Sequence, residues 1–97
     1  MPSAASTFAT QNASRYLQQL CKHFSHKVKV EYSRQSGSAE LPGGKLKLEA
    51  TSAALLVRLE SEAPRDLVKA RYILEDHLVR FAFKEKLLGL NWTYEAD

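Results

Sequence analysis

The stretch Lys45–Glu60, which reads KLKLEATSAALLVRLE, carries the clearest pattern of secondary structure in this chain. Leucine or valine recurs at every second position over Lys45–Ala50 and again over Ala54–Glu60, and this period of two is typical of a β-strand with one buried face. The two strands predict an antiparallel meander with one apolar and one charged face. We therefore expect helices to cover the apolar face only.

The residues before this stretch extend the meander toward the N-terminus. Lys27–Tyr32 alternates charged and apolar residues and predicts another strand, whereas Ser33–Ser38 is typical of a turn. Pro42–Gly44 indicates either a second turn or a bulge within a longer strand that starts near Ala39. We favour the bulge, because a loop from residue 33 to residue 44 would be long for so small a domain.

Apolar stripes with helical spacing predict two helices. The first covers Ala13–His26 with Asn12 as its N-cap, and the second covers Pro64–Glu85 with proline in its first turn. The predicted buried face of the first helix consists of Ala13, Tyr16, Leu17, Leu20, Cys21 and Phe24. The main stripe of the second consists of Leu67, Ala70, Leu74, Leu78, Phe81 and Ala82.

The second helix carries a further apolar stripe, about 130° away from the main one. Its members are Val68, Tyr72, Val79 and Phe83. Because apolar stripes usually belong to a core, we expect this one to pack within the monomer. Cover by another subunit is the alternative, and it keeps a homodimer open.

The two ends of the chain complete the predicted fold. Residues 1–9 are expected to be frayed or to form a short edge strand, and Leu90–Tyr94 is expected to form a last strand after Gly89 breaks the helical pattern. The prediction is a single two-layer α+β domain over residues 1–97. Two helices pack on one face of a largely antiparallel sheet of about four to five strands.

Composition sets limits on the class of protein. The 97 residues are 44% hydrophobic and 26% charged, which is a globular balance, and the net charge of +3 is a mild excess. No apolar run approaches the roughly 18 residues of a membrane span, and Met1–Ser6 lacks the features of a secretory signal. Because Cys21 is the only cysteine, an internal disulfide is excluded and a cytoplasmic location is expected.

Motifs for catalysis or nucleic-acid binding are missing from the sequence. It has no glycine-rich phosphate loop, no hydrolase nucleophile motif and no clear acid/base pair of carboxylates, so no catalytic residue is predicted and the balance is against an enzyme. The charged side of the strands mixes lysines with glutamates and has no interleaved aromatic residue for base stacking. We therefore expect no nucleic-acid partner.

Three histidines are the candidate metal ligands. His23 and His26 are three residues apart and could chelate as a pair, and His77 flanks the main stripe of the second helix, from which it could meet His23. A transition metal is the cofactor that such a site would take. Cys21 points about 160° away from His23 on the same helix and cannot share that metal. Helix-end capping or hydrogen bonding is the alternative role of these histidines.

Two arginines are candidate ligand-binding residues. Arg71 lies within the main apolar stripe of the second helix. Its guanidinium either extends to solvent or pairs with a buried carboxylate or an anionic ligand. Arg80 lies on the polar side, on a cationic surface that can meet a phosphate or a carboxylate.

Two longer segments carry a family resemblance. Ala13–Lys27, ASRYLQQLCKHFSHK, and Asp76–Glu85, DHLVRFAFKE, followed by Asn91 and Trp92, resemble the paired signatures of the bacterial domain of unknown function 2218. The resemblance implies a small bacterial protein. Similar domains occur beside or joined to siderophore-interacting, flavin-dependent ferric-reductase-like proteins, which implies a link to iron handling.

The functional prediction is a non-enzymatic binding or accessory module, with a link to iron or siderophore metabolism that rests on the resemblance alone. Its partner is an unknown protein or small ligand. One alternative is a small metal-dependent enzyme that uses His23, His26 and His77. A second alternative is a homodimeric interaction protein that uses the further stripe of the second helix.

Overall fold

A computed structural model describes residues 2–95 and has six strands in one sheet, in the order β2-β3-β4-β5-β1-β6. The strands are β1 (Ser3–Ala9), β2 (Val30–Tyr32), β3 (Ser36–Leu41), β4 (Gly44–Ala50), β5 (Ala54–Glu60) and β6 (Thr93–Glu95). The helices are α1 (Ala13–Phe24), α2 (Pro64–Phe81) and a single 3₁₀ turn, η1 (Phe83–Glu85). Every neighbouring pair of strands is antiparallel. The predicted α+β class is confirmed, but the sheet has six strands and not four to five.

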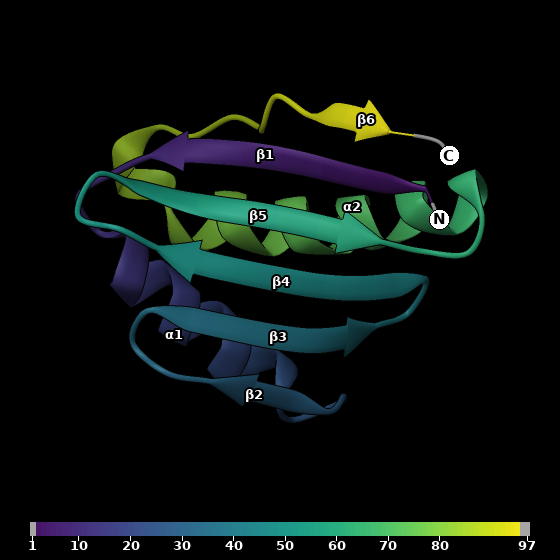
Figure 1. Cartoon of the computed structure of the whole chain (residues 1–97). Helices are drawn as coiled ribbons and strands as arrows, with labels where there is room; N and C mark the ends of the chain where they lie inside the picture. The colour runs from purple at the N-terminus through teal and green to yellow at the C-terminus, as the bar shows by residue number, and fades with distance from the viewer. Residues whose placement is uncertain (1, 96–97) are drawn as a thin grey trace.

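The sheet has one covered and one open face, as the alternation in β4 and β5 predicts. Leu46 lies opposite Leu59 and Leu48 lies opposite Val57, and all four side chains are buried. Figure 1 views the sheet from its open face, with both helices behind it. The core therefore lies between the sheet and the helices.

Pro42–Gly44 is a tight turn, so the predicted bulge is wrong. Leu41 pairs with Gly44, and Pro42 and Gly43 form a two-residue hairpin connection between β3 and β4. Gly43 has a φ of 99°, a conformation that favours glycine. The turn frees Ser36–Leu41 to form a strand of its own, which accounts for one of the strands that the sequence prediction lacks.

Strand β1 is an interior strand and not a frayed or edge segment. It lies between β5 and β6, and it pairs with β5 along its whole length from Ser3 to Ala9. Its side chains are mostly small, so they leave only a weak pattern in the sequence although Ala4 and Ser6 are buried.

The helices end earlier than predicted. Helix α1 buries the six residues of its predicted face but stops at Phe24, and α2 stops at Phe81. After α2 the chain makes the turn η1, and Lys86 adopts a left-handed conformation with a φ of 57°. Such a residue ends a helix, so the periodicity that continues to Glu85 is not helical throughout.

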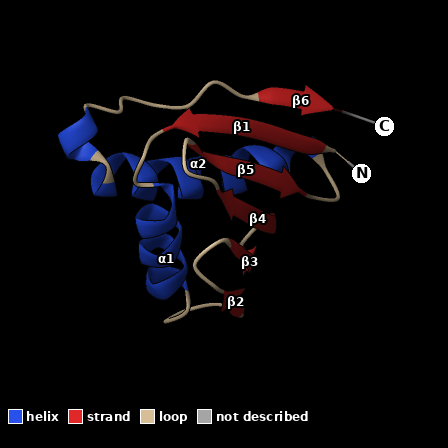
Figure 2. Ribbon diagram, turned by 60° about the vertical axis from the view of Figure 1, so that its left-hand side comes forward, coloured by secondary structure: helices blue, strands red, loops and turns tan. Residues whose placement is uncertain are grey.

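The segment after η1 returns along the sheet. Figure 2 shows it running beside β1 toward β6, with α1 and α2 on the same side of the sheet. The Ser6 hydroxyl donates to the carbonyl of Asn91 at 2.7 Å, which ties this segment to β1. Across residues 2–95, no helix combines the length and the apolar character that crossing a membrane requires.

Candidate functional site

The outer side of α2 is uncovered, which corrects one prediction. Tyr72 is 69% exposed and Phe83 is 68% exposed, and Val68 is also exposed. The further apolar stripe of α2 therefore does not pack within the monomer as expected. Helix α1 and the sheet contact α2, and the buried residues of α2 all belong to its main stripe.

The segment after α2 adds two more apolar side chains to this region. Leu88 is 94% exposed, and Tyr94 of β6 is about half exposed. Five of the seven large hydrophobic side chains exposed within the described residues lie on α2 or after it. We call this surface the exposed α2 face; it consists of the exposed side chains Val68, Tyr72, Phe83 of η1, Leu88 and Tyr94 and the half-buried Val79.

A hollow of about 210 Å³ lies within the exposed α2 face. It is lined by Arg71, Tyr72, Glu75, Asp76, Val79 and Leu88. Apolar side chains of α2 and of the segment after η1 thus line one hollow together with charged side chains. The sequence does not predict that Leu88 belongs to this surface, because Leu88 lies outside any periodic pattern of apolar residues.

The two predicted ligand-binding arginines have different surroundings. Arg71 is half-buried, and its Nη1 donates to the Tyr94 hydroxyl at 2.9 Å. Its Nε is buried and finds no acceptor among the described residues. Arg80 is exposed, and its Nη2 lies 3.3 Å from Oδ2 of Asp76, one turn earlier on α2. Arg71 is therefore the arginine with an unused donor.

The structure brings two of the three predicted metal-ligating histidines together. The ring centroids of His23, on the last turn of α1, and His77, in the second half of α2, are 4.6 Å apart. His26 lies in the turn after α1, and it makes no ring contact with the pair. In the part of the chain that the structure describes, three or more histidine, cysteine, aspartate or glutamate side chains do not gather as a metal site would require.

The histidine pair lines a second hollow, of about 220 Å³, between the end of α1 and α2. Nδ1 of His77 lies 2.7 Å from the carbonyl oxygen of Ile73, so this nitrogen is the donor and Nε2 is left free in the neutral ring. Partial burial lowers the pKa of His23, and the positive charges of His77, Lys27 and His26 lower it further.

Several hydrogen bonds to the Glu85 carboxylate join η1 to the start of α1, and the sequence does not predict them. We call this cluster the carboxylate hub. Glu85 of η1 accepts hydrogen bonds from the hydroxyls of Thr10 and Tyr16 and from the Asn12 side chain. Asn12 does not cap α1 with its side chain, because that side chain is turned toward Glu85. The Tyr16 hydrogen bond is the main reason why the pKa of Glu85 is lowered. The hub positions η1 at the start of α1.

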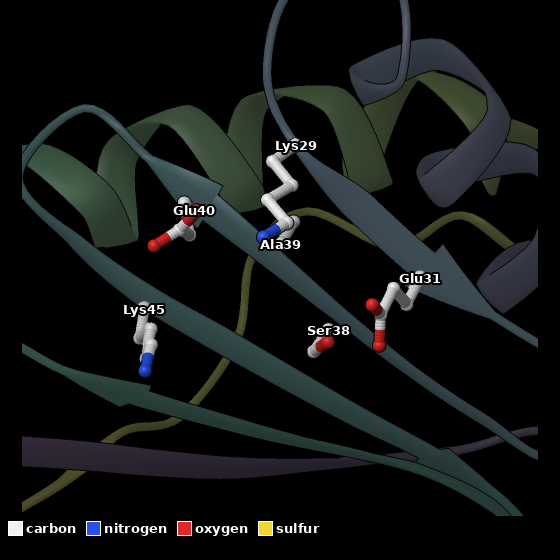
Figure 3. A pocket seen from close by; sticks show the side chains of 6 residues that line it. All are labelled: Lys29, Glu31, Ser38, Ala39, Glu40 and Lys45. Carbon is white, nitrogen blue, oxygen red and sulfur yellow. The ribbon is translucent and has the colours of Figure 1, made fainter.

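The open face of the sheet carries interleaved charges. A hollow of about 190 Å³ lies there. Figure 3 shows the residues that line it, Lys29, Glu31, Ser38, Ala39, Glu40 and Lys45. Lys45 lies between Glu40 of β3 and Glu60 of β5 in the register of the sheet. Alternating charges across neighbouring strands compensate one another, so this face is typical of a solvated surface.

Comparison with known proteins gives one solved structure and one family. The NMR structure of PA4090 from Pseudomonas aeruginosa is similar to this chain, with a TM-score of 0.77 and 28% sequence identity over 98% of this chain and 96% of that one. No curated protein matches the chain. The family model described as an uncharacterized protein conserved in bacteria, DUF2218, matches residues 5–93. This chain therefore belongs to the DUF2218 family of bacterial proteins.

Proposed function

We propose that this protein is a non-enzymatic binding module that docks another polypeptide on the exposed α2 face. The observation that carries the proposal is the gathering of exposed apolar side chains there, with Leu88 and Tyr72 on two sides of one hollow. Large apolar side chains that gather on a surface are costly to leave in water and are typical of an interaction site.

The residue types of this face suit a protein interface. Tyrosine and arginine are enriched among the residues that dominate binding free energies, because they combine apolar area with hydrogen bonding. Tyr72, Tyr94 and Arg71 supply both types around the hollow.

The occupant to which we commit is a second copy of this chain. A two-fold interface uses one patch on both subunits, so that patch has to be complementary to itself. The exposed α2 face meets one requirement of such a patch, because its hollow carries both signs of charge, Arg71 with Glu75 and Asp76, between apolar side chains. The net charge of +3 is small enough that repulsion between two copies does not oppose the contact.

The iron or siderophore setting implied by the family resemblance remains part of this proposal. In that setting the module would be an accessory to another protein. The proposal that His23, His26 and His77 hold a metal for catalysis is supported by one observation, the free Nε2 of His77, which suits a metal ligand whose other ring nitrogen binds a carbonyl. Two adjacent imidazoles are fewer ligands than a catalytic zinc site uses.

Sedimentation equilibrium on three single variants tests the docking proposal. Tyr72→Asp and Leu88→Asp place a charge within the exposed α2 face, and Leu56→Asp is the matched control on the open face of the sheet, where Leu56 is 36% exposed. We expect a concentration-dependent dimer for the unchanged protein and for Leu56→Asp, and a monomer for both variants of the α2 face.

A monomer at high micromolar concentration would contradict the second copy as the occupant. Two further results distinguish docking of a different protein from the absence of any docking function. If a partner captured from bacterial extract is lost with Tyr72→Asp and kept with Leu56→Asp, the face docks a different protein. If all three variants and the unchanged protein behave alike, the docking function itself is wrong.

A further inference from the structure

The hollow between α1 and α2 has a chemistry different from that of the docking face. It is lined by His23, Phe24, Lys27, Val28, Leu41, Pro42, Ile73 and His77. Three of these side chains are basic and none is acidic. The other five are apolar. We propose that this hollow binds a small carboxylate with an apolar body, of the size of a benzoate or a branched short-chain acid.

The charge arrangement selects an anion. Lys27 follows directly after α1 and His77 comes from α2, so the basic groups converge from separate elements of the fold. No carboxylate among the lining residues neutralises them. A carboxylate that enters therefore gains charge-assisted hydrogen bonds without displacing a protein carboxylate.

The imidazole of His77 is held ready for such a ligand. Its Nδ1 donates to the Ile73 carbonyl, which fixes the ring, and Nε2 donates to a carboxylate oxygen when it carries a proton. Phe24 meets the same ring edge to face, with centroids 5.2 Å apart. Because neighbours on both sides fix the ring, little side-chain entropy remains to be lost on binding.

The apolar side chains limit the size and type of the ligand. Phe24, Val28 and Leu41 come from α1, the turn after it and β3, and together with Ile73 they give the hollow an apolar wall. A volume of about 220 Å³ holds roughly seven waters, at about 30 Å³ each. That is below the usual range of pockets for larger metabolites, so the ligand is small.

Proton–carbon NMR of the imidazoles during a benzoate titration tests the proposal. We expect saturable shifts of the imidazole signals of His23 and His77. Lys27→Met should weaken binding about fivefold, because it removes one of the three basic groups of the hollow. Lys29→Met is the matched control, since Lys29 is two residues away and lies on the open face of the sheet; it should leave the affinity unchanged.

Three results would overturn the proposal. The first is the absence of saturation by benzoate at millimolar concentrations. The second is equal weakening by the two lysine variants, which would show only general charge attraction. The third is equal competition by acetate or phosphate, which would show that the apolar wall contributes nothing.

Zinc alone, titrated in parallel, would reveal a metal site if it binds one equivalent and benzoate does not bind. The amide spectra of both variants check that the fold is intact.

Discussion

The Glu75 carboxylate accepts a hydrogen bond from the indole N–H of Trp92 at 2.7 Å, and its second oxygen accepts one from the backbone N–H of Leu90 at 3.3 Å. These two bonds hold the segment after η1 against α2. Gly89 lies so close to the same carboxylate that a Cβ there would be 2.9 Å from Oε2. The position of Leu88, and with it the exposed α2 face, depends on this clamp.

Removing the clamp should loosen the C-terminal segment without unfolding the core. Glu75→Ala leaves the Trp92 N–H without its acceptor, and we expect a loss of about 1–3 kcal/mol in the free energy of unfolding. Trp92 is the only tryptophan in the chain, so its fluorescence should shift to the red in the native state. Asp76→Asn is the control, because it removes only an exposed ion pair and should cost less than about 1 kcal/mol. A native Trp92 spectrum that is unchanged in Glu75→Ala would contradict this role.

The carboxylate hub at Glu85 should make the free energy of unfolding depend on pH in the acidic range. The pKa of Glu85 lies below its ordinary value of 4.5, chiefly because of the Tyr16 hydrogen bond, so the folded protein binds this proton less readily than the unfolded chain. Its contribution is present above pH 4.5 and is lost as the pH falls through the lowered pKa. Urea unfolding of Glu85→Gln should show about 1 kcal/mol less stability at pH 7 and a smaller loss between pH 5 and pH 3. Equal acid sensitivity in both proteins would refute the assignment.

Gly37 should not tolerate a side chain while Cys21 is present. A Cβ at Gly37 would lie 2.8 Å from Sγ of Cys21 and 3.2 Å from Cβ of Tyr32. We expect Gly37→Ala to lower the free energy of unfolding by about 1–3 kcal/mol through overpacking. In the double variant Cys21→Ala/Gly37→Ala the sulfur is absent, so the combined loss should be smaller than the sum of the single losses. Strict additivity in chemical denaturation would show that the sulfur is not the obstacle.

The thiol of Cys21 should be unreactive in the folded protein. Its side chain is fully buried beneath the sheet, and this burial raises its pKa to about 11. At pH 8 the thiolate is therefore scarce and out of reach of a reagent. A thiol-reactive disulfide should modify Cys21 only at the rate of unfolding, and rapid modification under native conditions would contradict the packing of α1.

The sequence predicts those parts of the fold that large apolar side chains specify. Leucines at every second position define β4 and β5, and six residues at helical spacing define the buried face of α1. Strand β1 cannot be predicted in this way, because Ser3–Ala9 consists mostly of small residues, and their burial depends on pairing with β5, which is distant in the sequence. Pro42–Gly44 is compatible with a bulge or a turn, and only the pairing of Leu41 with Gly44 decides between them.

The candidate sites were predictable to a smaller extent. The angular position of His77 on its helix predicts that it can meet His23, and the rings are in contact. Periodicity also groups Val68, Tyr72 and Phe83 on one side of a helix, but it does not tell whether another part of the chain covers that side. Glu85 at a helix end is typical of a solvated charge, and its contacts with Thr10 and Tyr16 join residues more than 60 positions apart.

Docking of a second copy on the exposed α2 face is most directly tested by isotope-filtered NMR on a mixture of labelled and unlabelled protein at millimolar concentration. This measurement detects only contacts between different chains. We expect intermolecular contacts that involve the methyl groups of Leu88 and Val68 and the ring of Tyr72. Intermolecular contacts that are missing, or that involve only Leu56 and its neighbours on the open face of the sheet, would contradict it.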